Sequence, residues 1–289
     1  MWLPASGRPC LETSLARALP DQAEGLRRLF VADARRMVAM VPAGEDAEAG
    51  ASISSLAHAL AAQGKKVLLL DELLAAGETH VTFGVTPKHD LSTVVFNQAE
   101  VESALNKTTA GIDFLAGGDH AHSMPRPRME ARIGLVNAFY RLAGKYDVVL
   151  VNACIDVANS RPSFAWACQD VIVLSDSRPD AATEVYARIK LLHQAEKRRF
   201  HLLFRDLEQE RALALYRSIA AVSRRHLHVM PELLGVLPLG GNLLTGFYEQ
   251  LARMIQSWPI PEHKAGHFPD LMRRLLRGAD PHVLQTLLK

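Results

Sequence analysis

Short apolar runs alternate with amphipathic helical patterns along most of this chain. The runs are Met37–Val41, Val67–Leu70, Ile112–Leu115, Val148–Val151, Val171–Leu174, His201–Phe204 and Leu233–Leu237. Helical spacing predicts helices over Ile53–Gln63, Glu130–Gly144, Ala181–Glu196, Gln209–Arg224 and Asn242–Ser257. Strands that are buried on both sides read as continuous apolar runs, so this alternation is typical of a parallel sheet between helices. The chain is therefore predicted to be an α/β protein, with a mostly parallel sheet and helices on both faces.

The distribution of these patterns predicts three regions. Residues 36–258 are expected to form the α/β domain. Residues 1–35 are expected to be a flexible segment with a short helix over 21–29, because Pro20 suits a helix start. Residues 259–289 hold two short amphipathic patterns. Partner contacts are expected on these two flanks, which fall outside the sheet pattern.

The overall composition limits the class of protein. The 33 basic and 31 acidic residues leave a net charge of +2, so charge gives no reason to expect a nucleic-acid partner. Cys10, Cys154 and Cys168 form no C-x-x-C pair, which argues against a disulfide framework and a structural zinc site. The sequence has neither a signal-peptide core nor a run of roughly 18 apolar residues. We expect a cytoplasmic protein.

An acidic loop joins the first predicted strand to the first helix. Arg36–Asp71 reads as strand, loop, helix and strand, which is the layout of a nucleotide-binding βαβ unit. In such units the signature G-x-x-x-x-G-K-[ST] surrounds phosphate with backbone N–H groups and a lysine. The loop here, Pro42–Ala51, reads PAGEDAEAGA and lacks that lysine and most of those glycines. Its acidic side chains repel phosphate at short range.

Several segments resemble one family in their order and spacing. Leu68–Val85 follows the family pattern LLLDADLGLANVDVLLGL without a gap, and Tyr146–Asn152 is similar to the switch II strand YDYVLID. Ser175–Lys190 is similar to TPEPTSITDAYALIK. These segments resemble the MinD/ParA-type ATPases, and among them the flagellar-number regulators of the FlhG/FleN type. The resemblance runs from about Asp21 to about Pro238 and implies the MinD-like P-loop fold.

A short motif upstream of the first strand is the most specific element of this resemblance. Residues 21–27 read DQAEGLR and match the DQA-x-x-LR motif of FlhG-type proteins. In that family the motif engages FlhF, a signal-recognition-type GTPase. The resemblance therefore implies that FlhF is a partner of this chain, bound through Asp21, Gln22, Ala23, Leu26 and Arg27. The alternative is an ordinary solvent-facing helix, since these residue types are common in helices.

The same resemblance implies that the phosphate loop has lost its chemistry. The family motif KGGVGKT falls on Gly44–Gly50, with Gly44 at the signature lysine and Ala49 at the phosphate-bridging lysine. Gly50 stands where a hydroxyl holds Mg²⁺. The glycines that let the backbone approach phosphate are replaced by Glu45, Asp46 and Glu48. Ser52 lies two positions late, so a shifted register restores a hydroxyl but not the lysine.

Three further nucleotide-site positions differ from the family. Its second switch I aspartate falls on Leu73, although Asp71 is kept. Its switch II aspartate falls on Asn152, which is a poorer ligand for a hard cation, and Asp156 is the alternative carboxylate nearby. The asparagine that reads adenine falls on Arg205. Phosphoryl transfer depends on these parts for positioning and charge neutralisation, so we predict a pseudo-ATPase that binds neither ATP nor Mg²⁺.

Two other candidate sites carry less chemistry. His120 and His122 form a His-x-His pair with Asp119 beside them, but no further ligand follows at a confirming spacing. Cys154 lies just past a predicted strand, and no base accompanies it. We therefore predict no metal site and no catalytic residue.

The C-terminal flank has a basic amphipathic pattern. An apolar face lies beside Arg273 and Arg274 and is formed by Phe268, Leu271, Met272, Leu275 and Leu276. It is similar to the membrane-targeting helix that ends MinD and FlhG proteins. The alternative, that it packs on the domain, is favoured because so short a helix binds a bilayer weakly.

Together these observations predict a non-catalytic FlhG-like regulator of flagellar number or placement, acting through FlhF and not switched by ATP. Weak peripheral contact with the inner membrane and other flagellar or regulatory partners remain open. Two alternatives also remain: a residual or unusual ATPase of the MinD/ParA family, and a MinD-like adaptor for a transcription regulator or another membrane apparatus.

Overall fold

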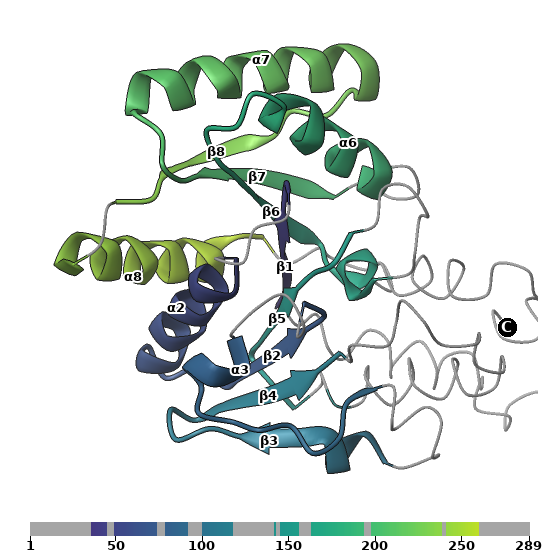
Figure 1. Cartoon of the computed structure of the whole chain (residues 1–289), viewed down its shortest axis with the longest axis vertical. Coiled ribbons are helices and arrows are strands. Elements are labelled where there is room, and N and C mark those ends of the chain that lie inside the picture. Colours follow the sequence, from purple (N-terminus) through teal and green to yellow (C-terminus); the bar gives the residue numbers. More distant parts are fainter. Residues whose placement is uncertain are drawn as a thin grey trace, which may run out of the picture.

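The computed structural model describes residues 36–44, 49–73, 79–91, 100–117, 142, 145–155, 163–193, 198–238 and 241–259. These residues form one sheet with helices on both faces (Figure 1). The strands are β1 (Arg36–Pro42), β2 (Val67–Asp71), β3 (Leu105–Lys107), β4 (Ile112–Ala116), β5 (Val148–Asn152), β6 (Asp170–Ser175), β7 (Arg199–Phe204) and β8 (Glu232–Val236). The helices are α2 (Ala49–Ala62), α3 (Thr79–Thr82), α6 (Ala181–His193), α7 (Gln209–Leu227) and α8 (Gly241–Ser257), with 3-10 turns η2 (Val101–Ala104) and η4 (Phe164–Ala167).

The sheet has eight strands in the order β3-β4-β2-β5-β1-β6-β7-β8. Neighbouring strands run parallel, except that β3 is antiparallel to β4. The predicted α/β class and the mostly parallel sheet are confirmed. In a parallel sheet the carboxyl ends of the strands meet at one edge, and ligands bind at that edge in open α/β folds.

The predicted strands are all present, with ends shifted by one or two residues. The prediction did not include β3, whose three residues Leu-Asn-Lys carry no apolar run. Helix α2 begins four residues earlier than predicted, at Ala49, because Ala49 and Gly50 are already buried in its first turn. Of the predicted helix 130–144, only Leu142 is described, as helical.

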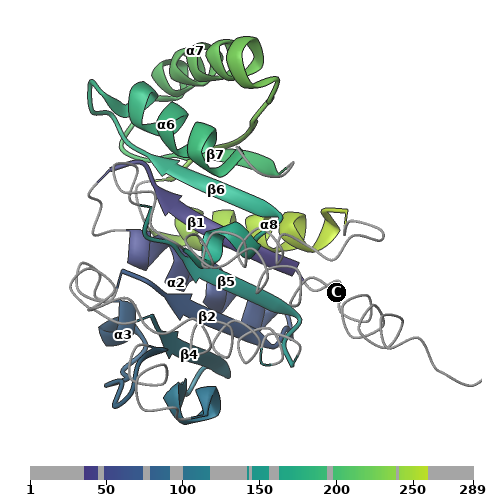
Figure 2. The same cartoon turned by 90° about the vertical axis from the view of Figure 1, so that its right-hand side faces the viewer.

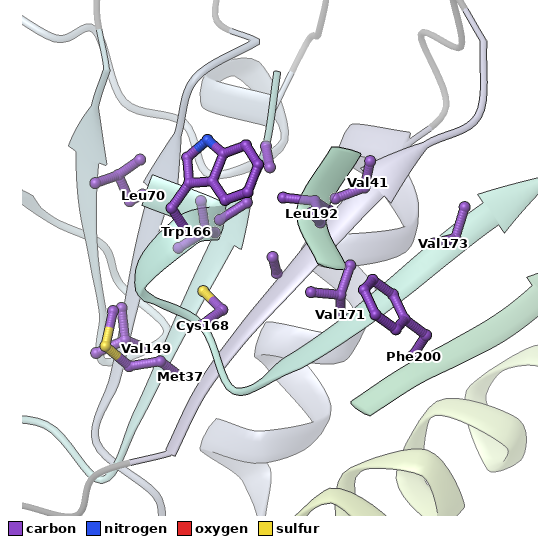
Figure 3. Close-up of a cluster of buried hydrophobic side chains, with 14 of the residues drawn as sticks. Met37, Val41, Leu70, Val149, Trp166, Cys168, Val171, Val173, Leu192 and Phe200 are labelled. Atoms are coloured by element: carbon purple, nitrogen blue, oxygen red, sulfur yellow. The ribbon is translucent and has the colours of Figure 1, made fainter. Parts of the chain in front are cut away.

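Side chains from the two faces of the sheet build two cores. Helices α2 and α8 pack together on one face, and in Figure 2 they lie behind the strands. Helices α6 and α7 cover the other face, where Trp166 is fully buried among strand side chains such as Val149 and Val171 (Figure 3). Consecutive residues of β1 are buried alternately in the two cores, Val38 in one and Ala39 in the other. This explains why the strand reads as a continuous apolar run.

The ends of the described domain are fastened to each other. The guanidinium of Arg36, at the start of β1, donates hydrogen bonds to the carbonyl oxygens of Ile255 and Trp258, the latter at 2.8 Å. The indole of Trp258 stacks on the buried His201 ring with centroids 4.0 Å apart. The predicted flanks, 1–35 and most of 259–289, lie outside the described residues. No helix in the described part of the chain is long and apolar enough to cross a membrane.

Candidate functional site

The ends of β2 and β5 bring the switch I and switch II positions together at the carboxyl edge of the sheet. Asp71 and Asn152 are register partners, and the Asn152 amide donates to Asp71 Oδ1 at 2.8 Å. The backbone N–H of Leu73 donates to the same oxygen at 3.0 Å. Burial raises the pKa of Asp71, although these two hydrogen bonds lower it in part. Asn152 thus serves as a hydrogen-bond donor to the kept aspartate.

The first turn of α2 has no room for a side chain at the hydroxyl position of the phosphate loop. A Cβ atom added to Gly50 would lie 2.5 Å from Thr79 Oγ1, closer than real Cβ contacts allow. Thr79 belongs to α3 and is 1% exposed, so its hydroxyl fills this space. The Thr79 hydroxyl lies close enough to Asp71 to lower the pKa of its carboxyl group. Among the described residues, however, neither Asp71 Oδ2 nor Thr79 Oγ1 has a hydrogen-bond partner of normal geometry.

An arginine from the connection between β6 and α6 lies against the start of the phosphate loop. A Cβ atom added to Gly44 would overlap the guanidinium of Arg178. That guanidinium donates to Asp176 Oδ2 at 2.8 Å and to Glu184 Oε2 at 3.2 Å, so acids of its own region already neutralise it. The position of the family's signature lysine is therefore a glycine under an ion-paired arginine.

Arg205 follows the end of β7, at the same edge as Asp71 and Asn152. Its Nε donates to Asp206 Oδ2 at 2.8 Å, and Asp206 has a left-handed backbone with φ of 52°. The guanidinium of Arg205, the residue that the resemblance aligns with the asparagine, is therefore ion-paired with its own neighbour in the chain. The acidic residues 45, 46 and 48 lie outside the described residues, as do Asp119, His120, His122 and Asp156. Within the described residues no group of three or more His, Cys, Asp or Glu side chains is arranged to hold a metal ion.

Glu72 is a residue of this edge that the sequence prediction missed. Its carboxylate accepts three hydrogen bonds: from the Cys154 N–H at 3.0 Å, the Ser163 hydroxyl at 2.6 Å and the Phe164 N–H at 2.7 Å. Although part of the residue is accessible, enclosure of the carboxylate raises the pKa of Glu72 to about 7, against the lowering effect of these hydrogen bonds. The sequence did carry a signal for this residue, because an acidic side chain directly follows Asp71 at the end of a predicted strand.

Comparisons with known proteins agree with this fold. No family model matches the chain. A curated relative, the antiactivator FleN of Pseudomonas aeruginosa, is 27% identical over 243 residues, which cover 77% of this chain and 87% of FleN. Among solved structures, the MinD cell division protein of Aquifex aeolicus matches with a TM-score of 0.54 and 18% identity over 85% of this chain and 98% of that one. Cobyrinic acid a,c-diamide synthase of Mycobacterium smegmatis, solved with ADP and magnesium, matches with a TM-score of 0.58 and 21% identity over 77% and 94%.

The strand order, the parallel register and these structural neighbours define the MinD/ParA-type P-loop NTPase fold. FleN, the relative found by sequence, is similar over most of the chain and points to a narrower group within this fold class. The chain is similar in sequence to FleN and shares the fold of the MinD/ParA-type proteins.

Proposed function

We propose that this chain is a non-catalytic FlhG/FleN-like regulator of flagellar number or placement, which binds an FlhF-type GTPase through residues 21–27. The relative FleN is named an antiactivator, which supports a regulatory role. The observation that carries the non-catalytic part is the close approach of Thr79 to Gly50. A side chain that would hold Mg²⁺ at position 50 meets a buried hydroxyl 2.5 Å from its Cβ.

The other described positions support the same proposal. Asn152 donates a hydrogen bond to Asp71 where the family uses a carboxylate, and Arg205 is ion-paired where the family reads adenine. At the start of the loop, Arg178 lies against Gly44 and is neutralised by its own acids. ATP hydrolysis needs positive charge and a metal ion positioned on the phosphates, and these side chains supply neither.

Titration calorimetry with Mg-ATP and Mg-GTP tests the non-catalytic part. We expect no magnesium-dependent heat and no shift in the unfolding temperature with up to millimolar nucleotide. The matched control is each nucleotide with EDTA, which separates metal-dependent binding from weak anion effects. A saturable, magnesium-dependent response would overturn this part and favour the residual ATPase.

Binding of the purified full chain to the GTPase tests the partner. The triple variant Asp21→Ala, Leu26→Ala, Arg27→Ala is expected to lose most of the affinity, because a short motif concentrates its binding energy in a few side chains. The control is Lys107→Ala with Glu249→Ala, two exposed positions on the domain. Equal binding by both variants and the unaltered chain would rule out the motif as the contact.

A second candidate function is an adaptor that acts on a transcription regulator. The name of the relative, an antiactivator, favours it. Interaction with such a regulator would then survive deletion of residues 1–35, whereas binding to the GTPase would not. Measuring both interactions with the same deletion variant separates the two candidates.

A further inference from the structure

Two short segments that are distant from Glu72 in the sequence contact its carboxylate. Glu72 directly follows β2, Cys154 follows β5, and Ser163 and Phe164 begin η4. Oε2 accepts from the Cys154 N–H and the Ser163 hydroxyl, and Oε1 accepts from the Phe164 N–H. One carboxylate therefore fastens both ends of the connection that runs from Cys154 to Ser163.

All three groups that contact the Glu72 carboxyl group are hydrogen-bond donors. The Ser163 Oγ atom accepts the Ala165 N–H at 3.1 Å, so its own hydrogen is free to point to Glu72 Oε2, 2.6 Å away. Backbone N–H groups have no acceptor function, so the Cys154 and Phe164 amides also need an acceptor at this point. Charged acceptors make shorter and stronger hydrogen bonds than neutral ones. The three donors therefore surround an acceptor position, and the carboxyl group that occupies it belongs to the chain itself.

We propose that the Glu72 carboxyl group is a tethered acceptor, which fills a hydrogen-bond acceptor position at the carboxyl edge of the sheet and clamps β2, β5 and η4 together without any bound ligand. The clamp goes beyond the regulatory role proposed above and depends on neither ATP nor a partner. It predicts a specific ligand chemistry: once the side chain is shortened, a small carboxylate such as acetate enters the vacated position. Part of Glu72 is exposed although its carboxylate is enclosed, so shortening the side chain is expected to open that position to solvent.

Chemical rescue of Glu72→Ala tests the clamp. We measure hydrogen exchange at the amides of Cys154 and Phe164, and the unfolding temperature, in increasing sodium acetate with sodium chloride at matched ionic strength. Loss of the carboxylate is expected to speed exchange at both amides by about tenfold or more, since each donor loses its acceptor. Acetate, but not chloride, is expected to restore part of the protection and of the unfolding temperature.

Glu72→Gln is the matched control. Its side chain still fills the position, so acetate has no room to bind, and its NH₂ group faces donors instead of accepting from them. We expect faster exchange that acetate does not change. The proposal would be contradicted if the amides of Cys154 and Phe164 in Glu72→Ala exchanged as slowly as in the wild type. It would also be contradicted if acetate and chloride changed the exchange of this variant equally.

A third variant keeps the proposal testable if Glu72→Ala does not fold. Ser163→Ala removes only the hydroxyl donor and leaves the carboxylate bound to two amides. Faster exchange at Cys154, whose amide shares Oε2 with this hydroxyl, is expected. Unchanged exchange across residues 153–155 and 163–166 would overturn the clamp.

Discussion

Two buried carboxylates at opposite edges of the sheet have pKa values shifted in opposite directions. At Glu72, desolvation exceeds the effect of the hydrogen bonds and raises the pKa to about 7. At Asp170, the first residue of β6, burial also acts to raise the pKa, but hydrogen bonds from His201 and Arg199 outweigh it and lower the pKa. The two pKa values shift in opposite directions because Asp170 faces a charged guanidinium, whereas Glu72 faces neutral hydrogen-bond donors.

Glu72 makes the stability of the domain depend on pH. Its pKa is raised from 4.5 to about 7 in the folded chain, so the folded state holds its proton more tightly. The stabilisation is complete below about pH 4.5 and is lost as pH rises to about 7. It amounts to about 3 kcal/mol, at about 1.4 kcal/mol per pKa unit. Urea unfolding should show that the free energy of unfolding of the wild type, relative to that of Glu72→Gln, falls as the pH rises through this range. Parallel pH profiles would refute the assignment.

Asp170 holds the buried ion pair at the other edge. Arg199 donates to both its oxygens, at 2.7 and 2.6 Å, and His201 lies 3.0 Å away. Asp170→Asn leaves the cation without its partner, so we expect a loss of about 3 kcal/mol in the free energy of unfolding. Asp176→Asn, which breaks the more exposed pair with Arg178, should cost less than about 1 kcal/mol. Denaturant unfolding of both variants checks the contrast, and equal losses would contradict it.

At the scale of elements, the start of α2 depends on a contact with α3. Of the four residues by which α2 exceeds its predicted start, Ala49, Gly50 and Ser52 are buried, and Gly50 lies beside the Thr79 hydroxyl. Local helical periodicity gives no sign of this extension, because alanine and glycine carry little apolar pattern. A tertiary contact, and not helix propensity, decides where this helix begins.

Placing a side chain at Gly50 tests this contact. Gly50→Ser should lower the free energy of unfolding by about 1 to 3 kcal/mol, because its Cβ lies too close to a buried hydroxyl. Adding Thr79→Ala should recover most of the loss. Gly246→Ser in α8 is the control, since nothing lies within 4 Å of a Cβ there. Chemical unfolding measures all three, and a neutral Gly50→Ser, or no recovery in the double variant, would disprove the crowding.

At the scale of the whole molecule, the strand order makes one edge of the sheet from residues distant in sequence. β2, β5, β1, β6 and β7 lie side by side, so Asp71, Asn152, Gly44, Ser175 and Arg205 lie along that edge. The opposite edge joins the start of β1 to the end of α8 through Arg36. Both predicted flanks are therefore attached at the edge remote from the loop that follows β1.

The oligomeric state should not respond to nucleotide. ATP drives dimerisation in the family that the chain resembles, and the lysine positions of the loop are Gly44 and Ala49 here. We expect the same molar mass by size-exclusion chromatography with light scattering in buffer, in magnesium alone and in Mg-ATP. A magnesium-dependent doubling of mass on adding ATP would contradict the non-catalytic proposal.

Most of the fold follows from local pattern, and only part of the site does. Strands buried on both faces are apolar throughout, so the central strands are recognisable, whereas β3 is a partly exposed antiparallel edge strand without that signature. Asp71 and Asn152 each end a predicted strand, but their pairing depends on the strand order, which places β2 beside β5. Contacts such as Thr79 with Gly50, or Arg178 with Gly44, join loops and helix ends. Sequence spacing does not predict which residues of such segments come into contact.

Periodicity and residue identity were enough to define the α/β class, the order of its elements and the absence of lysine from residues 42–51. Those properties depend on local hydrophobic pattern and residue identity, which the linear chain carries in full. The tertiary structure alone decided that Thr79 fills the space at Gly50 and that Glu72 binds donors from two distant segments. Such contacts arise from packing across the sheet edge, where strand register and burial set the distances.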